Sequence, residues 1–365
     1  EALNVEISPF HKSVIRLVRI QSGVPKQGMK GKGWSIADQP FRVPLADQEK
    51  VHVPTRLESM TLRPPSGAQH TLFDPASDAS VVITEVGATL RVFTVGERDV
   101  VVPFGPDEIC PAGHGAILAP WPNRLADGRY TWDGTTYQVP ITEIDRNTAL
   151  HGLVNHARWH LIERTPTSAS LGLNTVPIGG YPWELEMVAT YTLEGRNLTI
   201  EVSATNLSDT AAPYGIGFHP WLSPGPGGLD AATMRLDATS WVHPNERLLP
   251  DGVEELPEHL DFRTTRPIEQ ADLDDAFVNI TRDEEGLSWI HIGGDDGHTA
   301  SVWMDESMNA WQACSGDHIG ALDYRRAGMA AEPMSCIADA FNTGDSLVRL
   351  EPGATHAVRW GLRLS

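Results

Sequence analysis

Cysteine is scarce in this chain, and its pattern excludes two classes of protein. The 365 residues contain three cysteines, Cys110, Cys314 and Cys336, and no CxxC pair. Disulfide-stapled domains and zinc sites need more, and more closely spaced, cysteines. We therefore expect neither a disulfide framework nor a bound metal, and a reducing cytoplasm fits this composition.

Long apolar runs, catalytic glycine motifs and positive charge are also in short supply. No apolar run reaches the roughly 20 residues that a membrane-spanning helix needs. The sequence has no GxSxG elbow, P-loop or dinucleotide-binding glycine fingerprint, so nothing in it supports hydrolase, kinase or dehydrogenase chemistry. The 28 Lys and Arg against 48 Asp and Glu give a formal net charge of −20. This charge disfavours nucleic acid and membrane as partners and mildly favours a neutral substrate.

The first 59 residues differ in charge from the rest of the chain. They hold nine Lys or Arg and six acidic residues, whereas the remainder is strongly acidic. The segment lacks a periodic apolar pattern. We expect residues 1–59 to form a poorly ordered N-terminal extension, with at most a short helix over 13–20.

Alternating apolar and polar residues dominate from residue 71 onward. The clearest alternation runs over 185–193 and resumes over 198–205, after a turn at Glu194-Gly195-Arg196-Asn197. A period of two with one polar face predicts antiparallel strands. Similar patterns cover 81–95, 130–139, 287–292, 300–304 and 356–364. No long helical period competes with them, so the pattern predicts an all-β fold, a large antiparallel β-sandwich.

Two segments concentrate side chains that suit a small polar ligand. Pro120-Trp121-Pro122-Asn123-Arg124 holds an indole and a guanidinium beside two prolines, and Asn147-Thr148-Ala149-Leu150-His151-Gly152 supplies an imidazole. Arg and His side chains donate hydrogen bonds to oxygen, and an aromatic face can stack on a sugar ring. These segments predict a sugar site with Trp121, Trp183 or Trp221 as the stacking face, although tryptophans in sandwiches are more often core residues.

These segments resemble the aldose 1-epimerase (galactose mutarotase) family, whose members carry a Pro-Trp-x-Asn-Arg run, a hairpin and then Leu-His-Gly. Three more segments follow in the family's order: Gly217-Phe218-His219-Pro220-Trp221, Leu273-Asp274-Asp275-Ala276-Phe277 and Ala331-Glu332-Pro333-Met334. The resemblance covers roughly residue 60 to the C-terminus. It implies one mutarotase-like β-supersandwich domain over 60–365, with the sugar in an open cleft on one sheet.

The resemblance implies that the protein interconverts the α and β anomers of free hexoses such as glucose and galactose. The reaction removes the proton of the O1 hydroxyl, protonates the ring oxygen O5 and recloses the open aldehyde. One base and one acid suffice for it, so we expect no cofactor and no metal. The expected partner is a small sugar, and the expected state is a monomer or weak homodimer.

Each role in this chemistry falls on a named residue. The family's glutamate matches Glu332, whose apolar neighbours would raise its pKa and make it a better base. His219 is the expected acid, because an ordinary imidazole has a pKa of about 6.5. The resemblance assigns sugar binding to Arg124, His151, Asp274, Asn123 and Trp121. Phe218 stands where many members have Asn, which leaves the finer substrate preference open.

Each of these residues also has an ordinary structural explanation. Glu332 could lie at the surface of an edge strand, His219 could be a core histidine, Arg124 could pair with Asp127, His151 could cap a turn, and Asp274 could be a solvated member of an acidic run. His156 and His160 have the spacing of a helical metal pair, but their surroundings predict extended chain.

Two other functions stay open. A hexose 6-phosphate epimerase of the same fold would need a basic cluster near the cleft, for which Arg325 and Arg326 are candidates. A sugar-binding sandwich without turnover would need no matched acid and base, so the presence of Glu332 and His219 argues against it.

Overall fold

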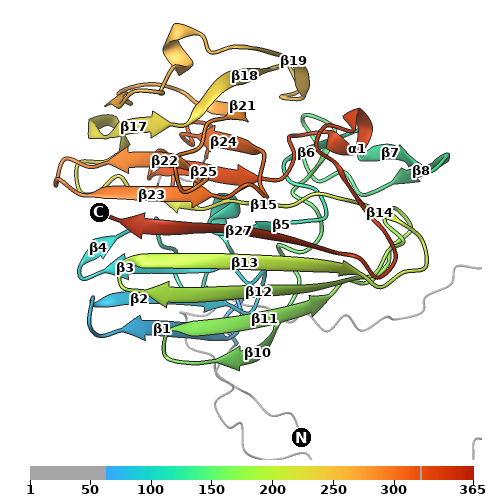
Figure 1. The fold of residues 1–365 in the computed structure, drawn as a ribbon, viewed down its shortest axis with the longest axis horizontal. Helices are drawn as coiled ribbons and strands as arrows, with labels where there is room; N and C mark the ends of the chain where they lie inside the picture. The colour runs from blue at the N-terminus through green and yellow to red at the C-terminus, as the bar shows by residue number, and fades with distance from the viewer. Residues whose placement is uncertain (1–62, 321–322) are drawn as a thin grey trace, which may run out of the picture. The chain divides into compact units, whose positions relative to one another are not determined.

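The structure, a computed structural model, describes residues 63–320 and 323–365 (Figure 1). The predicted extension over 1–59, with its short helix at 13–20, lies outside the described residues. The described part consists mainly of antiparallel strands, as predicted, and it includes one α-helix, α1 (Ala340–Thr343). None of its helices is long and apolar enough to cross a membrane. The cytoplasmic location stays a prediction.

The largest sheet has nine strands and runs across the centre of Figure 1. Its order in space is β10 (His160–Arg164), β11 (Ser168–Asn174), β12 (Leu185–Glu194), β13 (Asn197–Asn206), β27 (Thr355–Leu364), β23 (Thr299–Met304), β22 (Ser288–Gly293), β17 (Thr233–Leu236) and β20 (Arg266–Pro267).

The β12–β13 hairpin shows why the sequence forms this sheet. Apolar side chains at every second position of both strands are buried, and the polar ones between them are more exposed. The register pairs Leu185 with Asn206 and Glu194 with Asn197, so Gly195 and Arg196 form the turn. Gly195 has a positive φ of 60°, which a glycine adopts without strain. The predicted hairpin is therefore confirmed.

The second large sheet carries the candidate site. Its order is β19 (Pro250–Glu255), β18 (Ala238–Pro244), β21 (Asp274–Ile280), β24 (Ala310–Cys314), β25 (Met329–Met334), β15 (Gly217–Phe218) and β5 (Ile117–Leu118), with β16 (Trp221–Leu222) also pairing with β25. All six residues of β25 are buried, so this strand lies in the interior of the protein.

Smaller elements complete the described part. One four-stranded sheet contains β1 (Gln69–Asp74), β2 (Ala79–Thr84), β3 (Leu90–Val95) and β4 (Arg98–Asp99); three strand pairs are β6 (Arg124–Ala126) with β9 (Thr148–Leu150), β7 (Arg129–Trp132) with β8 (Thr135–Gln138), and β14 (Ala212–Tyr214) with β26 (Val348–Leu350). The 3-10 helices are η1 (Pro111–Gly113), η2 (Leu229–Ala231) and η3 (Glu258–Leu260). The predicted strand region 81–95 contains two strands, because the chain turns at Gly87 and Ala88, both with positive φ.

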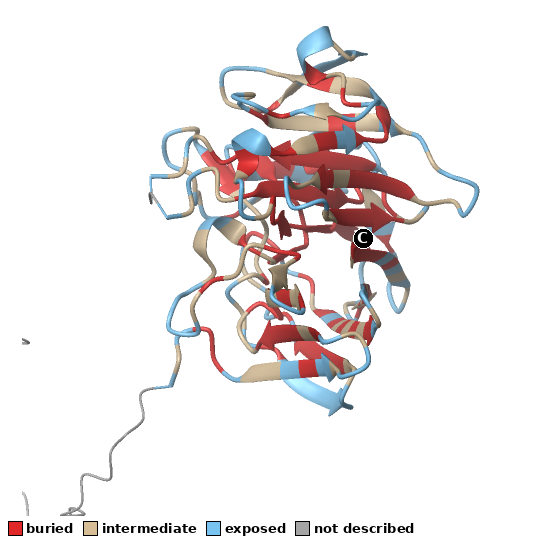
Figure 2. Cartoon of the chain, turned by 90° about the vertical axis from the view of Figure 1, so that its left-hand side faces the viewer, coloured by how far each residue is buried: buried red, intermediate tan, exposed pale blue. Residues whose placement is uncertain are grey.

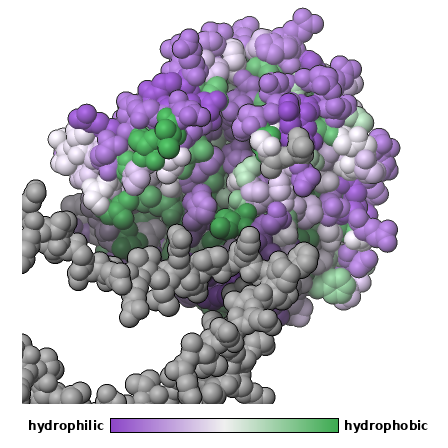
Figure 3. Space-filling view, turned by 180° about the vertical axis from the view of Figure 1, so that it is seen from behind, coloured by the Kyte–Doolittle hydropathy of each residue, from purple (hydrophilic) through white to green (hydrophobic). Residues whose placement is uncertain are grey.

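The two large sheets share one apolar core, which confirms the predicted sandwich. The Phe218 ring of β15 lies 4.8 Å from the Trp360 ring of β27, and both side chains belong to one buried cluster. Figure 2 shows buried residues along the strands and exposed residues mainly in loops and edge strands. Seen from behind, the coloured surface is mostly hydrophilic with limited apolar areas (Figure 3). Burial of the apolar faces is the main stabilising contribution to such a fold.

Candidate functional site

The residues predicted for catalysis and sugar binding converge on one cavity of about 220 Å³. This volume is below the ~300–1,000 Å³ of pockets that hold drug-sized ligands, so the cavity suits a small molecule. Its lining consists of Ala112, Gly113, Asn123, Arg124, Glu143, Arg146, Leu150, His151, His219, Trp221, Asp274, Cys314, His318 and Glu332. Six of the seven predicted site residues are in this set, and Trp121 is not.

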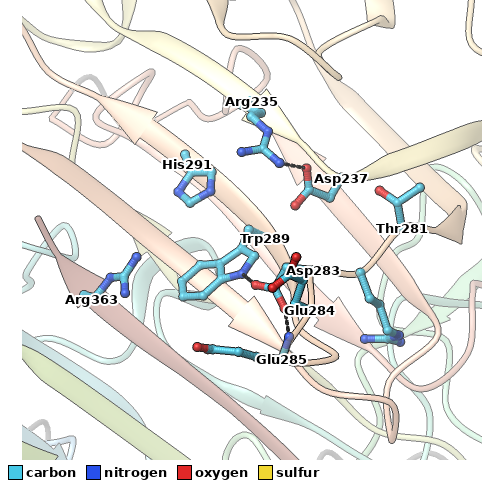
Figure 4. Close-up of a pocket in the computed structure, with 10 residues that line it drawn as sticks. Arg235, Asp237, Thr281, Asp283, Glu284, Glu285, Trp289, His291 and Arg363 are labelled. Atoms are coloured by element: carbon cyan, nitrogen blue, oxygen red, sulfur yellow. Dashed lines mark hydrogen bonds and ion pairs between the residues drawn. The ribbon is translucent and has the colours of Figure 1, made fainter.

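A larger hollow of about 550 Å³ lies elsewhere, on the nine-stranded sheet (Figure 4). Two pairs of its polar side chains bond to each other. Arg235 and Asp237 form an ion pair of 2.7 Å, and Trp289 donates its indole N–H to Asp283 at 2.7 Å. None of the predicted site residues lines it, so the smaller cavity is the candidate active site.

Strand register brings His219 and Glu332 together. β15 pairs Gly217 with Met334 of β25, and β16 pairs Trp221 with Ala330 of the same strand. Continuing this antiparallel register places His219, midway between the two short strands, opposite Glu332. The atoms His219 Nε2 and Glu332 Oε1 are 3.3 Å apart, and both side chains reach the cavity. Two segments more than 100 residues apart in sequence thus form one pair.

Burial disfavours charge on both members of this pair. Glu332 is only 2% exposed, and burial, followed by the nearby Asp274 carboxylate, raises its pKa well above the ordinary value despite the opposing Arg124 guanidinium. Burial, together with the imidazoles of His151 and His114, lowers the pKa of His219 well below its ordinary value. The sequence predicted the direction for Glu332. The expectation of an ordinary imidazole pKa for His219 is wrong, because the ring is buried among other imidazoles.

Unpartnered polar atoms mark the pair as chemically available. Glu332 Oε2 and His219 Nδ1 are buried and have no hydrogen-bond partner among the described residues. Buried polar atoms of this kind are rare in proteins and call for an explanation. Gly113 lies against the imidazole, since a Cβ there would come within 2.9 Å of His219 Cδ2. Glycine at this position lets the loop approach the ring.

Asp274 stands beside the pair at the start of β21. Asp274 pairs with Cys314 of β24. Two residues before Cys314 in the same strand, Gln312 pairs with Glu332 of β25. Gln312 donates its amide N–H to Asp274 Oδ1 at 2.8 Å. This bond leaves Oδ2 of the carboxylate facing the Arg124 guanidinium at 3.7 Å. The Asp274 carboxylate is therefore held in place by Gln312 and Arg124 as a hydrogen-bond acceptor, and it is not a freely solvated acid.

The short β6–β9 ladder brings Arg124 and His151 to the same cavity. Arg124 pairs with Leu150, and the backbone N–H of His151 donates to the Asn123 carbonyl at 2.9 Å. Asn123 and His151 both have positive φ, an uncommon conformation for such residues that often marks functional sites. Gly152 is required next, because a Cβ there would lie 2.1 Å from the Ala119 carbonyl oxygen.

Glu143 is a site residue that the sequence analysis missed. Its carboxylate accepts two hydrogen bonds from Arg124, at 2.9 and 3.1 Å. The alternative partner named from the sequence, Asp127, instead pairs with Arg247 at 2.8 Å. Glu143 carries no recognisable motif. Only the pairing of β6 with β9 reveals that its loop folds back over Arg124.

Trp121 is not part of the cavity. Its indole is buried, donates its N–H to the Ala149 carbonyl at 3.1 Å and packs edge-on against Phe341. Trp221 lines the cavity instead, but it lies parallel to His114 with ring centroids 4.6 Å apart. The proline-flanked Trp121 thus serves the core, which corrects its predicted contact with sugar.

His156, His160 and Trp183 are not among the described residues that line the cavity. His160 lies in β10 and His156 in the turn before it, so they do not share a helix. Within 63–320 and 323–365, no group of three or more His, Cys, Asp or Glu is arranged to hold a metal. Trp183 is buried and donates to Thr210 at 3.0 Å, away from the cavity lining.

Comparison of this chain with known sequences finds matches to one family. The sequence model of the aldose 1-epimerase family matches residues 69–363. The uncharacterised protein YihR of Escherichia coli (strain K12) is 33% identical over 291 residues, which cover 77% of this chain and 89% of YihR. The galactose mutarotase of Rattus norvegicus is 30% identical over 227 residues, which cover 56% of this chain and 64% of the rat protein.

Comparison with solved structures supports the fold. The GalM/aldose epimerase homologue from C. elegans superposes with a TM-score of 0.72 at 20% identity, covering 82% of this chain and 99% of the other. Galactose 1-epimerase from Lactobacillus acidophilus NCFM gives a TM-score of 0.69 at 19% identity, with 81% and 94% covered. At these identities the likeness concerns the fold.

Proposed function

Because this chain belongs to the aldose 1-epimerase family, we propose that it interconverts the α and β anomers of free hexoses, with glucose and galactose as the first substrates to test. In this reaction the O1–H proton leaves, the C1–O5 bond breaks and O5 takes up a proton. The C1 aldehyde then turns about C1–C2, and O5 closes on its other face. Atoms and electrons balance without any other reactant.

The observation that carries the proposal is the 3.3 Å separation of His219 Nε2 and Glu332 Oε1 at the cavity. O1 and O5 are bonded to the same carbon, so the base and the acid must lie side by side. Glu332 takes the proton from O1, and His219 gives a proton to O5. The two roles reverse when the ring closes, as microscopic reversibility requires, and such contacts tighten when substrate binds.

The buried pair holds one proton in two arrangements. In the resting site the raised pKa of Glu332 and the lowered pKa of His219 favour an uncharged carboxyl beside an uncharged imidazole. Transfer of that proton across the pair gives a carboxylate base and an imidazolium acid. Sugar hydroxyls that hydrogen-bond to both groups lower the cost of this charge separation.

Four further side chains bind the sugar in this proposal. Arg124 and His151 donate hydrogen bonds to hydroxyl oxygens, while Asp274 accepts from hydroxyl groups. Burial, followed by the charge of Arg124, lowers the pKa of His151 to about 3, so this imidazole is uncharged near neutral pH. Asn123 Oδ1 accepts the Arg124 backbone N–H at 2.8 Å, which leaves its amide N–H₂ for the ligand.

Free hexoses are favoured over hexose 6-phosphates by the positions of two arginines. Arg326 is bound to Asp230 and Asp317 at 2.7 Å each. Neither Arg325 nor Arg326 is among the described residues that line the cavity. Arg326 is thus engaged by two carboxylates, and Arg325 is not part of the described cavity lining. A binder without turnover is disfavoured, because it would gain nothing from a paired carboxyl and imidazole.

Polarimetry tests the proposal. Freshly dissolved α-D-glucose and α-D-galactose should reach the equilibrium rotation faster in proportion to the concentration of protein. For glucose 6-phosphate, followed in the same way, the protein should increase the rate of anomer equilibration much less. Identical rates with and without protein for both free sugars would refute the epimerase, and calorimetric sugar binding in that case would identify a binding protein.

A further inference from the structure

The loop between β8 and β9 closes on itself and places Glu143 at the cavity. The backbone N–H of Glu143 donates to the Thr148 carbonyl at 3.0 Å, and the Thr148 N–H returns a bond to the Glu143 carbonyl at 3.1 Å. The Glu143 side chain is 16% exposed and belongs to the cavity lining. It therefore combines limited solvent access with direct contact to the site.

Four hydrogen bonds converge on the Glu143 carboxylate. Arg124 donates from Nε at 2.9 Å and from Nη2 at 3.1 Å, Thr148 donates its hydroxyl at 2.7 Å, and Arg146 donates from Nη1 at 2.9 Å. Partial burial opposes ionisation of Glu143, but the bonds from Arg124 and Thr148 outweigh it and lower the pKa to about 2. Glu143 is a carboxylate throughout the working range of pH. The bidentate hydrogen bonding between Glu143 and Arg124 also fixes the plane of the Arg124 guanidinium.

The charges on the cavity wall are balanced only when Glu143 is counted. Arg124 and Arg146 bring two positive charges, and Glu143 and Asp274 bring two negative ones. The remaining titratable groups of the described lining are His151, His219, His318, Cys314 and Glu332. Burial favours the uncharged forms of His151, His219, Cys314 and Glu332. His318 is the one other imidazole of the described lining.

We propose that Glu143 is a specificity-determining and positioning residue, which orients Arg124 and cancels its charge so that the cavity accepts uncharged sugars and rejects anionic ones. The inference rests on the proposed epimerase function. A guanidinium without its carboxylate partner would attract an acidic sugar. Charges a few ångströms apart near a protein surface interact strongly enough to alter selection by about an order of magnitude.

D-Glucose and D-glucuronate form the test pair, because they share the ring and differ at C6 by a CH₂OH against a carboxylate. Glu143→Gln keeps the size of the side chain and removes its charge. We expect kcat/KM for glucuronate relative to glucose to rise about tenfold in Glu143→Gln, mainly through KM, and to fall back toward the wild-type value at high salt. Glu143→Asp, which keeps the charge, should retain the wild-type preference even where its shorter reach lowers overall activity.

Two further variants make the result specific. Glu351→Gln removes a carboxylate that binds Arg349 at 2.9 Å on the surface, and it should leave the preference unchanged. Arg146→Gln removes a cation from the same cluster and should shift the preference in the opposite direction, toward glucose. This opposite shift also tests the proposal if Glu143→Gln does not fold.

The outcomes separate this inference from the proposed function. If the wild-type protein accelerates neither free glucose nor free galactose, the epimerase itself is refuted. If the wild type accelerates glucose but Glu143→Gln and Arg146→Gln keep the wild-type preference, charge selection by Glu143 is refuted while the epimerase stands.

Discussion

His219 lies opposite Glu332 in the register that β15 and β16 make with β25, and their side-chain atoms Nε2 and Oε1 are 3.3 Å apart. A core histidine would normally bond to a backbone carbonyl. This one instead leaves Nδ1 without a partner among the described residues and turns Nε2 to a buried carboxyl. The arrangement suits proton transfer better than structural support.

His219→Gln should remove the acid while keeping a side chain that can hydrogen-bond. We expect kcat for mutarotation to fall by about 10²–10⁴-fold, the usual contribution of a general acid or base. His356→Gln is the matched control, because His356 is a half-buried histidine of β27 packed beside Tyr214, outside the described cavity lining. Equal loss in both variants would indicate a general effect on the fold.

Trp121→Phe tests the correction made to the sugar-contact prediction. The change removes the hydrogen bond to the Ala149 carbonyl and leaves a small void beside Phe341. We expect the free energy of unfolding to fall by about 1–3 kcal/mol, with KM for glucose within twofold of the wild type. A large rise in KM without loss of stability would return Trp121 to the binding site.

His114 should make stability depend on pH. Burial lowers its pKa to about 4, although a bond to the Pro111 carbonyl at 2.5 Å opposes this shift. The unfolded chain therefore binds a proton near pH 6.5 that the folded protein takes up only near pH 4. His114 thus contributes stability above pH 6.5 that is lost as the pH falls toward 4, by about 1.4 kcal/mol per pH unit.

Urea unfolding at pH 7, 6 and 5 measures this effect. The wild-type protein should lose stability over this range, with His151 and His219 adding to the slope in the same direction and Glu332, whose folded pKa is raised, opposing it. His114→Gln should flatten the slope by about 1.4 kcal/mol per pH unit between pH 6 and 5. An unchanged slope would contradict the buried, uncharged state of His114.

Local pattern was enough to predict much of the fold. The β12–β13 hairpin follows from residues that alternate with period two on both sides of a Gly195 turn, because each strand buries one face. The pattern over 81–95 does not place the turn between β2 and β3, where Gly87 and Ala88 both have positive φ. A glycine is compatible with such a turn, but the positive φ of Ala88 does not follow from an alanine in the sequence.

The site was partly predictable, through resemblance rather than through pattern. Glu332 and His219 were assigned from motifs, and register explains why they meet. The role of Glu143 could not be predicted, since it depends on a loop that folds back over Arg124. Trp121 and Trp221 each follow a proline, and packing shows which of the two is the core residue and which lines the cavity.

The most direct measurement of the central claim is the mutarotation rate of Glu332→Gln with α-D-glucose, followed by polarimetry beside Glu351→Gln. Gln keeps the shape of the buried uncharged carboxyl, so folding and sugar binding should persist while kcat falls about 10²–10⁴-fold. Glu351→Gln, altered on the surface, should match the wild type. A Glu332→Gln protein that equilibrates the anomers at the wild-type rate would contradict the account.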